Sequence, residues 1–148
     1  MAHTSAVYTH GYHESVLRAH RRRTAENSAA YLVPYLKPGM SLLEIGCGAG
    51  TVSADLAALI APGCVTALDV APEALRIAEV EAEARGLTNM EFVIGDVHTL
   101  DVGDSSFDVV HAHQVLQHVV DPVRALEQMR RVCRSGGIVA ARDGDFAG

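Results

Sequence analysis

The sequence predicts a doubly wound α/β domain, in which helices cover both faces of one mostly parallel sheet. Short apolar runs typical of buried strands alternate along the chain with longer segments whose apolar residues recur at helical spacing. Strands that alternate with helices pair in parallel through right-handed crossovers, and we expect the strand order 3-2-1-4-5. The expected strands lie at residues 41–45, 64–70, 90–96, 107–113 and 138–142.

Residues 1–36 are expected to form an N-terminal segment ahead of the sheet. Residues 1–11 are polar and rich in histidine, so we expect them to be disordered or to need a ligand for their order. A helix is expected from Tyr12 to Tyr35, where Pro34 disturbs its end. A turn at Lys37-Pro38-Gly39 then opens the sheet domain, expected over residues 37–148.

The first two expected strands each lead into a helix. After the first strand and a glycine-rich turn, "TVSADLAALIA" (51–61) has apolar residues at helical spacing, and Pro62-Gly63 closes this helix. The second strand, "CVTALDV", precedes Pro72, which suits the first turn of a helix. That helix continues to residue 85, and Gly86 ends it.

The remaining units are a strand, an acidic loop, and a strand-helix-strand unit. "MEFVIGD" is followed by a loop over residues 98–106, and "FDVVHAH" is the fourth strand. Asp121 suits the N-cap and Pro122 the first position of a helix that runs to residue 133. Gly136-Gly137 is expected to turn the chain into the last strand, Ile138–Arg142.

Composition excludes several classes of protein. A chain of 148 residues is long enough for one domain with a real core, and its net charge of -6 disfavours a nucleic-acid partner. No apolar run approaches the ~20 residues that span a bilayer, and the N-terminus lacks the layout of a signal peptide. The three widely spaced cysteines fit a reduced, cytoplasmic protein better than a disulfide framework or a zinc site.

The turn in "LLEIGCGAG" (42–50) carries the first functional indication. Gly46, Gly48 and Gly50 let the backbone approach a ligand where a strand leads into a helix. Dinucleotide sites prefer G-x-G-x-x-G, whereas the third glycine here comes one residue early, and Glu44 would repel a pyrophosphate. An acid at this place suits a cationic ligand such as S-adenosylmethionine, which carries a sulfonium and an ammonium. A tight turn without a ligand is the alternative.

Two further acids follow the next two strands. Asp69 ends the second strand, where a carboxylate can accept both hydroxyls of a ribose; alternatively it caps the helix that begins at Pro72. Asp96 lies just past the third strand and can accept the exocyclic amine of adenine, while Val97 offers a backbone amide and an apolar side chain. The alternative for Asp96 is a polar turn. Acids after three consecutive strands together indicate a nucleoside-bearing cofactor.

These motifs, in this order and spacing, resemble the class I S-adenosylmethionine-dependent methyltransferases, particularly the small-molecule branch that includes the quinone-biosynthesis C-methyltransferases. The resemblance implies a Rossmann-like fold, S-adenosylmethionine as cofactor, S-adenosylhomocysteine as product, and a small-molecule methyl acceptor. It covers about residues 40–143, and the matching stretches are "LLEIGCGAGT", "VTALDVAPEAL", "FVIGDVHTLDVGDSSFDVVHAHQVLQHVVDP" and "RRVCRSGGIVAARD".

The resemblance also implies which residues bind the cofactor. Gly46, Cys47 and Gly48 would touch it through their backbone, and Glu44 would help to hold its methionyl end. Residues 1–36 would form a lid over the cofactor and part of the substrate site. The side chains of this segment that would line the site are Tyr8, His10, Tyr12, His13 and His20.

The nucleoside end of the cofactor is assigned in the same way. The resemblance implies that Asp69 binds the ribose and that Val70 lies beside the adenine. It further implies that Asp96 and Val97 receive the adenine.

Three histidines, His111, His113 and His118, lie near the end of the fourth strand. A metal site would need them to converge with a fourth ligand, and no metal is expected. His113 stands at the strand tip, where it either lines the pocket or accepts a proton from the acceptor. By resemblance, His113 and Gln114 face the methionyl end near the transferring methyl, and no residue is assigned as catalytic.

The sequence departs from the resembling family at its C-terminal end. The family's sheet carries two more strands after the fifth, whereas this sequence ends at "DGDFAG", so a C-terminally truncated domain is expected. An open edge on the fifth strand would then favour a homodimer. Two alternatives to a methyltransferase stay open: an NAD-dependent oxidoreductase, disfavoured by Glu44 and the early third glycine, and a non-catalytic cofactor-binding or dimerisation module.

Overall fold

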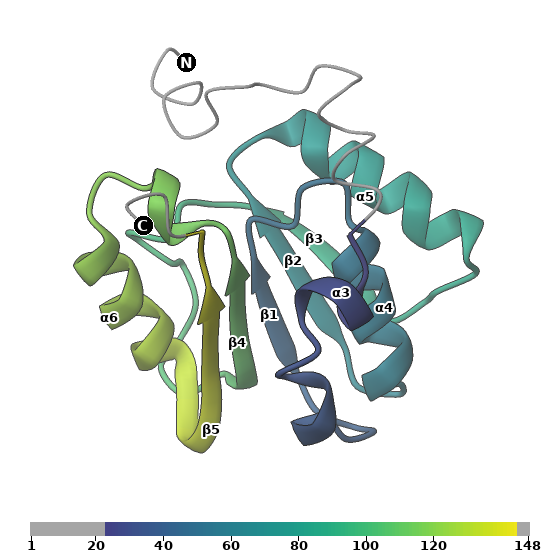
Figure 1. Cartoon of the computed structure of the whole chain (residues 1–148), viewed down its shortest axis with the longest axis horizontal. Helices are drawn as coiled ribbons and strands as arrows, with labels where there is room; N and C mark the ends of the chain where they lie inside the picture. Colours follow the sequence, from purple (N-terminus) through teal and green to yellow (C-terminus); the bar gives the residue numbers. More distant parts are fainter. Residues whose placement is uncertain (1–22, 145–148) are drawn as a thin grey trace.

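The computed structural model describes residues 23–144, which form one five-stranded sheet in the order β3-β2-β1-β4-β5 (Figure 1). All neighbouring strands pair in parallel. The predicted fold class and strand order are therefore confirmed. The strands are β1 (Leu42–Ile45), β2 (Val65–Asp69), β3 (Met90–Ile94), β4 (Phe107–His113) and β5 (Cys133–Arg142).

Helices cover both faces of this sheet. Three of them follow strands: α4 (Thr51–Ile60), α5 (Pro72–Ala84) and α6 (Pro122–Val132). Leu42 packs in the apolar cluster of α4, whereas Leu43 packs in the cluster of α6, because successive strand residues point to opposite faces. None of the helices within residues 23–144 is long and apolar enough to cross a membrane.

The local signals at the helix ends act as the sequence predicts. The side chain of Asp121 accepts a hydrogen bond of 3.1 Å from the backbone N–H of Arg124 and so caps α6. Gly86 has a φ of +68°, the left-handed conformation in which helices commonly end. At Gly50 a Cβ would lie 2.6 Å from Cβ of Ala78, so the third glycine of the turn lets α4 begin in contact with α5.

The predicted helix Tyr12–Tyr35 is wrong in the part that the structure describes. Only the short helix α3 (Ala25–Ser28) and the 3-10 turn η1 (Val33–Tyr35) are present between residues 23 and 36. Thr24 and Asn27 form a reciprocal capping box, which begins a new helix at residue 25. Residues 12–22 of the predicted helix lie outside the described residues.

The last strand begins earlier than predicted. Strand β5 starts at Cys133, directly after α6, although the expected strand was Ile138–Arg142 after a separate glycine turn. Its pairing with β4 is irregular, because Cys133 pairs with Phe107 while Ile138 pairs with Val109. Glycine suits this irregular stretch, because a Cβ on Gly137 would lie 2.6 Å from the carbonyl oxygen of Asp108.

Candidate functional site

A groove lies at the carboxyl ends of β1, β2 and β3. Parallel strands place these ends at one edge of the sheet, which is where open α/β sheets bind ligands. Apolar side chains and two carboxylates line it, a combination that suits an adenosine. The residues predicted from the sequence that the groove brings together are Gly46, Asp69, Val70, Asp96 and Val97; the others are Ile45, Leu68, Gly95, His98, Val115 and Val119.

The glycine turn is tied to β2 by Asp69. Gly46 and Gly48 have φ angles of +69° and +56°, which glycine adopts at little cost. One carboxylate oxygen of Asp69 accepts from the backbone N–H of Gly48 (3.2 Å), and the other accepts from that of Ala71 (2.9 Å). The alternative of Asp69 as the helix cap is wrong, because Ala71 occupies the N-cap of α5 without a side-chain bond. The carboxylate therefore holds the turn in place.

The side chain of Cys47 points into the protein interior. It packs with Ala67, Leu75 and Ala78. Burial, together with the charges of Asp69 and Glu44, raises the pKa of its thiol, so the group stays protonated at neutral pH. Such a buried thiol is inert, and the contact of Cys47 with a cofactor through its backbone stays a prediction.

The rim of the groove is held by His98, a residue that sequence reasoning missed. Asp96 accepts from the backbone N–H of His98 (2.8 Å), and its Oδ1 lies 2.6 Å from Nδ1 of the same ring. Nε2 of His98 accepts from the backbone N–H of Asp121 at 3.1 Å, so Nδ1 carries the proton and donates to Asp96. His98 thereby connects the loop after β3 to the start of α6. The sequence signal was a histidine two residues after a turn-forming Asp.

Glu44 is buried on the sheet face that packs against α4, and it is not among the residues that line the groove. Its Oε1 lies 2.6 Å from Nδ1 of His111, and Nε2 of His111 lies 3.1 Å from the hydroxyl of Tyr31. The two strands place Glu44 and His111 directly opposite each other. Burial lowers the pKa of His111, but the charge and hydrogen bond of Glu44 outweigh it and raise the pKa. We call these residues the Glu44–His111–Tyr31 chain.

His113 and Gln114 do not line the groove but lie beside it, at the carboxyl end of β4. The side-chain oxygen of Gln114 accepts from Arg23 at 2.7 Å, and its backbone N–H donates to the carbonyl of Arg142 at 2.6 Å. Nδ1 of His113 is buried without a hydrogen-bond partner among the residues that the structure describes. Burial and the positive charges of Arg23, His111 and Arg142 lower the pKa of His113 to about 4.

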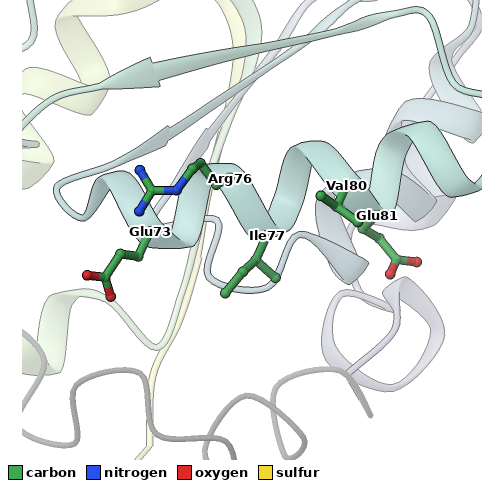
Figure 2. A pocket seen from close by; sticks show the side chains of 5 residues that line it. All are labelled: Glu73, Arg76, Ile77, Val80 and Glu81. Carbon is green, nitrogen blue, oxygen red and sulfur yellow. The ribbon is translucent and has the colours of Figure 1, made fainter.

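The described residues contain no group of three side chains able to hold a metal ion. A second hollow lies along the exposed side of α5, and Figure 2 shows its lining side chains, which all come from this helix. It shares no residue with the groove. Its lining residues are Glu73, Arg76, Ile77, Val80 and Glu81. Five of the predicted cofactor residues line the groove at the strand ends, and none lines the hollow on α5. The groove is therefore the candidate cofactor site.

Comparison with known proteins agrees with the sequence resemblance. The family model for a methyltransferase domain matches residues 36–147. An uncharacterized methyltransferase of Schizosaccharomyces pombe is 34% identical over 146 residues, covering 94% of this chain and 52% of that protein. The ubiquinone/menaquinone biosynthesis C-methyltransferase of Bdellovibrio bacteriovorus is 37% identical over 103 residues, covering 70% of this chain and 43% of that protein.

A solved structure of a methyltransferase is also similar to this chain. A SAM-dependent methyltransferase from Methanosarcina mazei is 33% identical with a TM-score of 0.62, covering 70% of this chain and 52% of that one. The chain thus spans about half the length of the curated relatives it matches. These matches agree with S-adenosylmethionine as the cofactor and give no support to the NAD-dependent alternative. The chain belongs to the methyltransferase domain family, in its class I S-adenosylmethionine-dependent form.

Proposed function

We propose that the protein transfers a methyl group to a small-molecule acceptor. The observation that carries this proposal is the groove, in which the glycine turn and two strand-end acids, Asp69 and Asp96, surround an apolar floor. When bound, S-adenosylmethionine supplies an electrophilic methyl group on a sulfonium. The protein's own part is to bind the nucleoside and to hold both reactants in line, because proximity and orientation supply much of the rate in such reactions.

The residues of the groove fit the nucleoside part of this cofactor. Leu68 and Val97 are almost fully buried beside the groove and offer an apolar surface to adenine. Asp69 is held at the end of β2 by two backbone N–H groups, the position at which such folds hydrogen-bond a ribose. Asp96 is fixed by His98 at the rim, on the side assigned to the adenine amine.

S-Adenosylhomocysteine is expected to bind the protein and to raise its melting temperature. A ligand that binds only the native state stabilises it by about 2.7 kcal/mol at a concentration 100 times its Kd. Thermal unfolding with and without the ligand, together with isothermal titration calorimetry, measures the effect. NAD serves as the control and should give neither heat nor a shift. Saturating S-adenosylhomocysteine without a thermal shift or binding heat would refute the proposed function.

Within the family, we assign the chain to the small-molecule branch. Support comes from the Bdellovibrio bacteriovorus relative, which is named as a C-methyltransferase of ubiquinone and menaquinone biosynthesis, and from the acidic net charge of -6. A nucleic-acid acceptor is not proposed, because such partners select basic surfaces. The sequence features also favour a cytoplasmic location.

We further propose that two copies associate through β5. This strand ends the sheet, and Val139 is 39% exposed. The carbonyl of Arg142 points to β4, because it accepts from Gln114; peptide groups alternate along a strand, so those of Val139 point outward. Unpaired outward groups of this kind are a template for pairing with another chain.

Val139→Pro is expected to reduce this self-association, because proline removes the outward N–H donor while β5 keeps its bonds to β4. Light scattering over a range of protein concentrations compares the variant with the parent. Val139→Thr retains the donor and a β-branched side chain, so it should associate like the parent. A parent protein that stays monomeric at high concentration would contradict the proposed edge pairing.

A further inference from the structure

Cationic side chains gather at the carboxyl ends of β4 and β5, beside the groove. His113 and Arg142 are direct register partners on these two strands. Gln114 joins Arg23 to them, because it accepts from the guanidinium of Arg23 and donates to the backbone of Arg142. We call Arg23 and Arg142, together with the neutral ring of His113, the cationic cluster. Three separate segments of the chain build it, so it is a product of the fold.

Arg142 brings to the cationic cluster a positive charge that no acid among the described residues pairs with. The guanidinium of Arg142 makes two long bonds of 3.4 Å, to the carbonyls of Asn27 and Ser28, and no carboxylate within residues 23–144 forms an ion pair with it. The neighbouring Asp143 accepts from the backbone of Gln117 at 3.2 Å. Burial and the positive charges of Arg23, His111 and Arg142 all lower the pKa of His113.

One ring nitrogen in the cationic cluster, Nδ1 of His113, is also buried without a hydrogen bond to the described part of the chain. Nδ1 of His113 is inaccessible to solvent and forms no hydrogen bond with any residue in the range 23–144, and a buried polar atom left in this way costs about 1–3 kcal/mol. The nearby acid Glu44 is not available to it, because Glu44 is engaged by His111. A ligand with negative charge and acceptor atoms would satisfy both Nδ1 of His113 and the guanidinium of Arg142.

The position of the cationic cluster relative to the groove indicates which anionic ligand the cluster binds. The groove occupies the ends of β1, β2 and β3, whereas the cationic cluster occupies the ends of β4 and β5 at the same edge of the sheet. A cofactor that lies in the groove with its nucleoside at β2 and β3 would present its methionyl end toward β4. A second reactant above β4 and β5 would then face that end.

We propose that the cationic cluster binds the methyl acceptor as an oxyanion. This inference rests on the proposed function, since it takes the groove to be the cofactor site. A second ligand could supply the oxyanion, because the methionyl carboxylate of the cofactor is also an oxyanion. Guanidinium groups bind oxyanions through strong, charge-assisted hydrogen bonds. The experiment below separates the two sources.

The test uses 4-nitrophenol, whose anion absorbs visible light, and its uncharged methyl ether 4-nitroanisole. Each is titrated into the full chain saturated with S-adenosylhomocysteine, at a pH where half of the free phenol is ionised. We expect the visible band of the phenolate to grow on binding. By calorimetry, 4-nitroanisole should bind at least roughly tenfold more weakly, which corresponds to one charged hydrogen bond.

Variants locate the site of binding. Arg142→Gln and Arg23→Gln should each weaken 4-nitrophenolate binding roughly tenfold. Arg130→Gln is the matched control, because it removes the same charge from an exposed position on α6, and it should leave the affinity unchanged. The melting temperature of each variant shows whether it is folded. A lower affinity is taken as loss of the binding site only in a variant that remains folded.

Several outcomes would overturn the proposal. Equal binding of the phenol and its ether would do so, as would an unchanged affinity in both Arg142→Gln and Arg23→Gln. If these variants weaken S-adenosylhomocysteine binding and leave 4-nitrophenolate binding intact, the cationic cluster belongs to the cofactor carboxylate. A parent chain that binds no S-adenosylhomocysteine refutes the proposed function instead, and the same titrations without that ligand then decide whether the oxyanion site exists.

Discussion

Glu44→Leu is expected to lower the free energy of unfolding by about 3–5 kcal/mol, the usual cost of removing one partner of a buried ion pair. His111 has no exposed surface, and its Nδ1 lies 2.6 Å from the carboxylate. Without Glu44 the ring keeps, of its hydrogen bonds to the described residues, the one with the hydroxyl of Tyr31. Urea unfolding of parent and variant at the same pH measures the loss.

The contribution of this pair depends on pH in a defined direction. Burial lowers the pKa of His111, but Glu44 raises it above its usual value, and the second effect is larger. A histidine with a raised folded-state pKa stabilises fully below its unfolded pKa of about 6.5, and this stabilisation is lost as the pH rises through the folded-state pKa. The stability difference between the parent and Glu44→Gln should therefore be largest on the acidic side and shrink toward alkaline pH.

Two controls make this prediction specific. The double variant Glu44→Leu with His111→Leu should recover much of the lost stability, because apolar replacement of a whole buried pair is often neutral or stabilising. In Glu44→Gln, burial acts on His111 without the opposing charge, so an NMR titration should give a lower pKa than in the parent. A loss below about 1 kcal/mol in Glu44→Leu, the scale of a surface ion pair, would contradict the structure of this pair.

Asp69→Ala is expected to weaken S-adenosylhomocysteine binding by roughly 1.5–3 kcal/mol, the scale of hydrogen bonds to a charged group. The structure adds a second effect. The backbone N–H groups of Gly48 and Ala71 lose their acceptor, which should lower the stability of the fold by about 1–3 kcal/mol. Calorimetric titration measures the first effect, and urea unfolding of the unliganded protein measures the second.

Asp101→Ala is the matched control, since this carboxylate is exposed in the loop before β4. It should change neither quantity. Asp69→Asn keeps the shape of the side chain and one carbonyl acceptor, so it should restore part of the stability but less of the ligand affinity. If Asp69→Ala loses stability and still binds S-adenosylhomocysteine as tightly as the parent, the residue only supports the glycine turn.

Most of the fold could be predicted because its signals are local. Strand β4 has the predicted bounds, and α5 and α6 begin at the predicted prolines, Pro72 and Pro122. These signals lie in a few neighbouring residues: apolar spacing, a capping side chain, a proline in the first turn, a glycine at the end. Five predicted cofactor residues also meet in one groove, because parallel strands bring their carboxyl ends to one edge.

The errors arose where a local signal was weak or competed with another. The prediction of one long N-terminal helix did not take Thr24 into account. Thr24 forms a capping box with Asn27 that begins a separate short helix. The glycine pair before the last strand was interpreted as a turn, since glycine favours turns as well as irregular strands. Only the close approach of Gly137 to the backbone of Asp108 shows which of the two is formed.

By itself the sequence determined the fold class, the strand order and the edge of the sheet that carries the groove. The tertiary structure alone decided which side chains meet: Glu44 pairs with His111 across 67 residues, and Arg23 bonds to Gln114 across 91. The physical reason is that such contacts depend on the register between strands and on where a distant segment packs. Neither is encoded in any short stretch of residues, whereas apolar periodicity, caps and turns are.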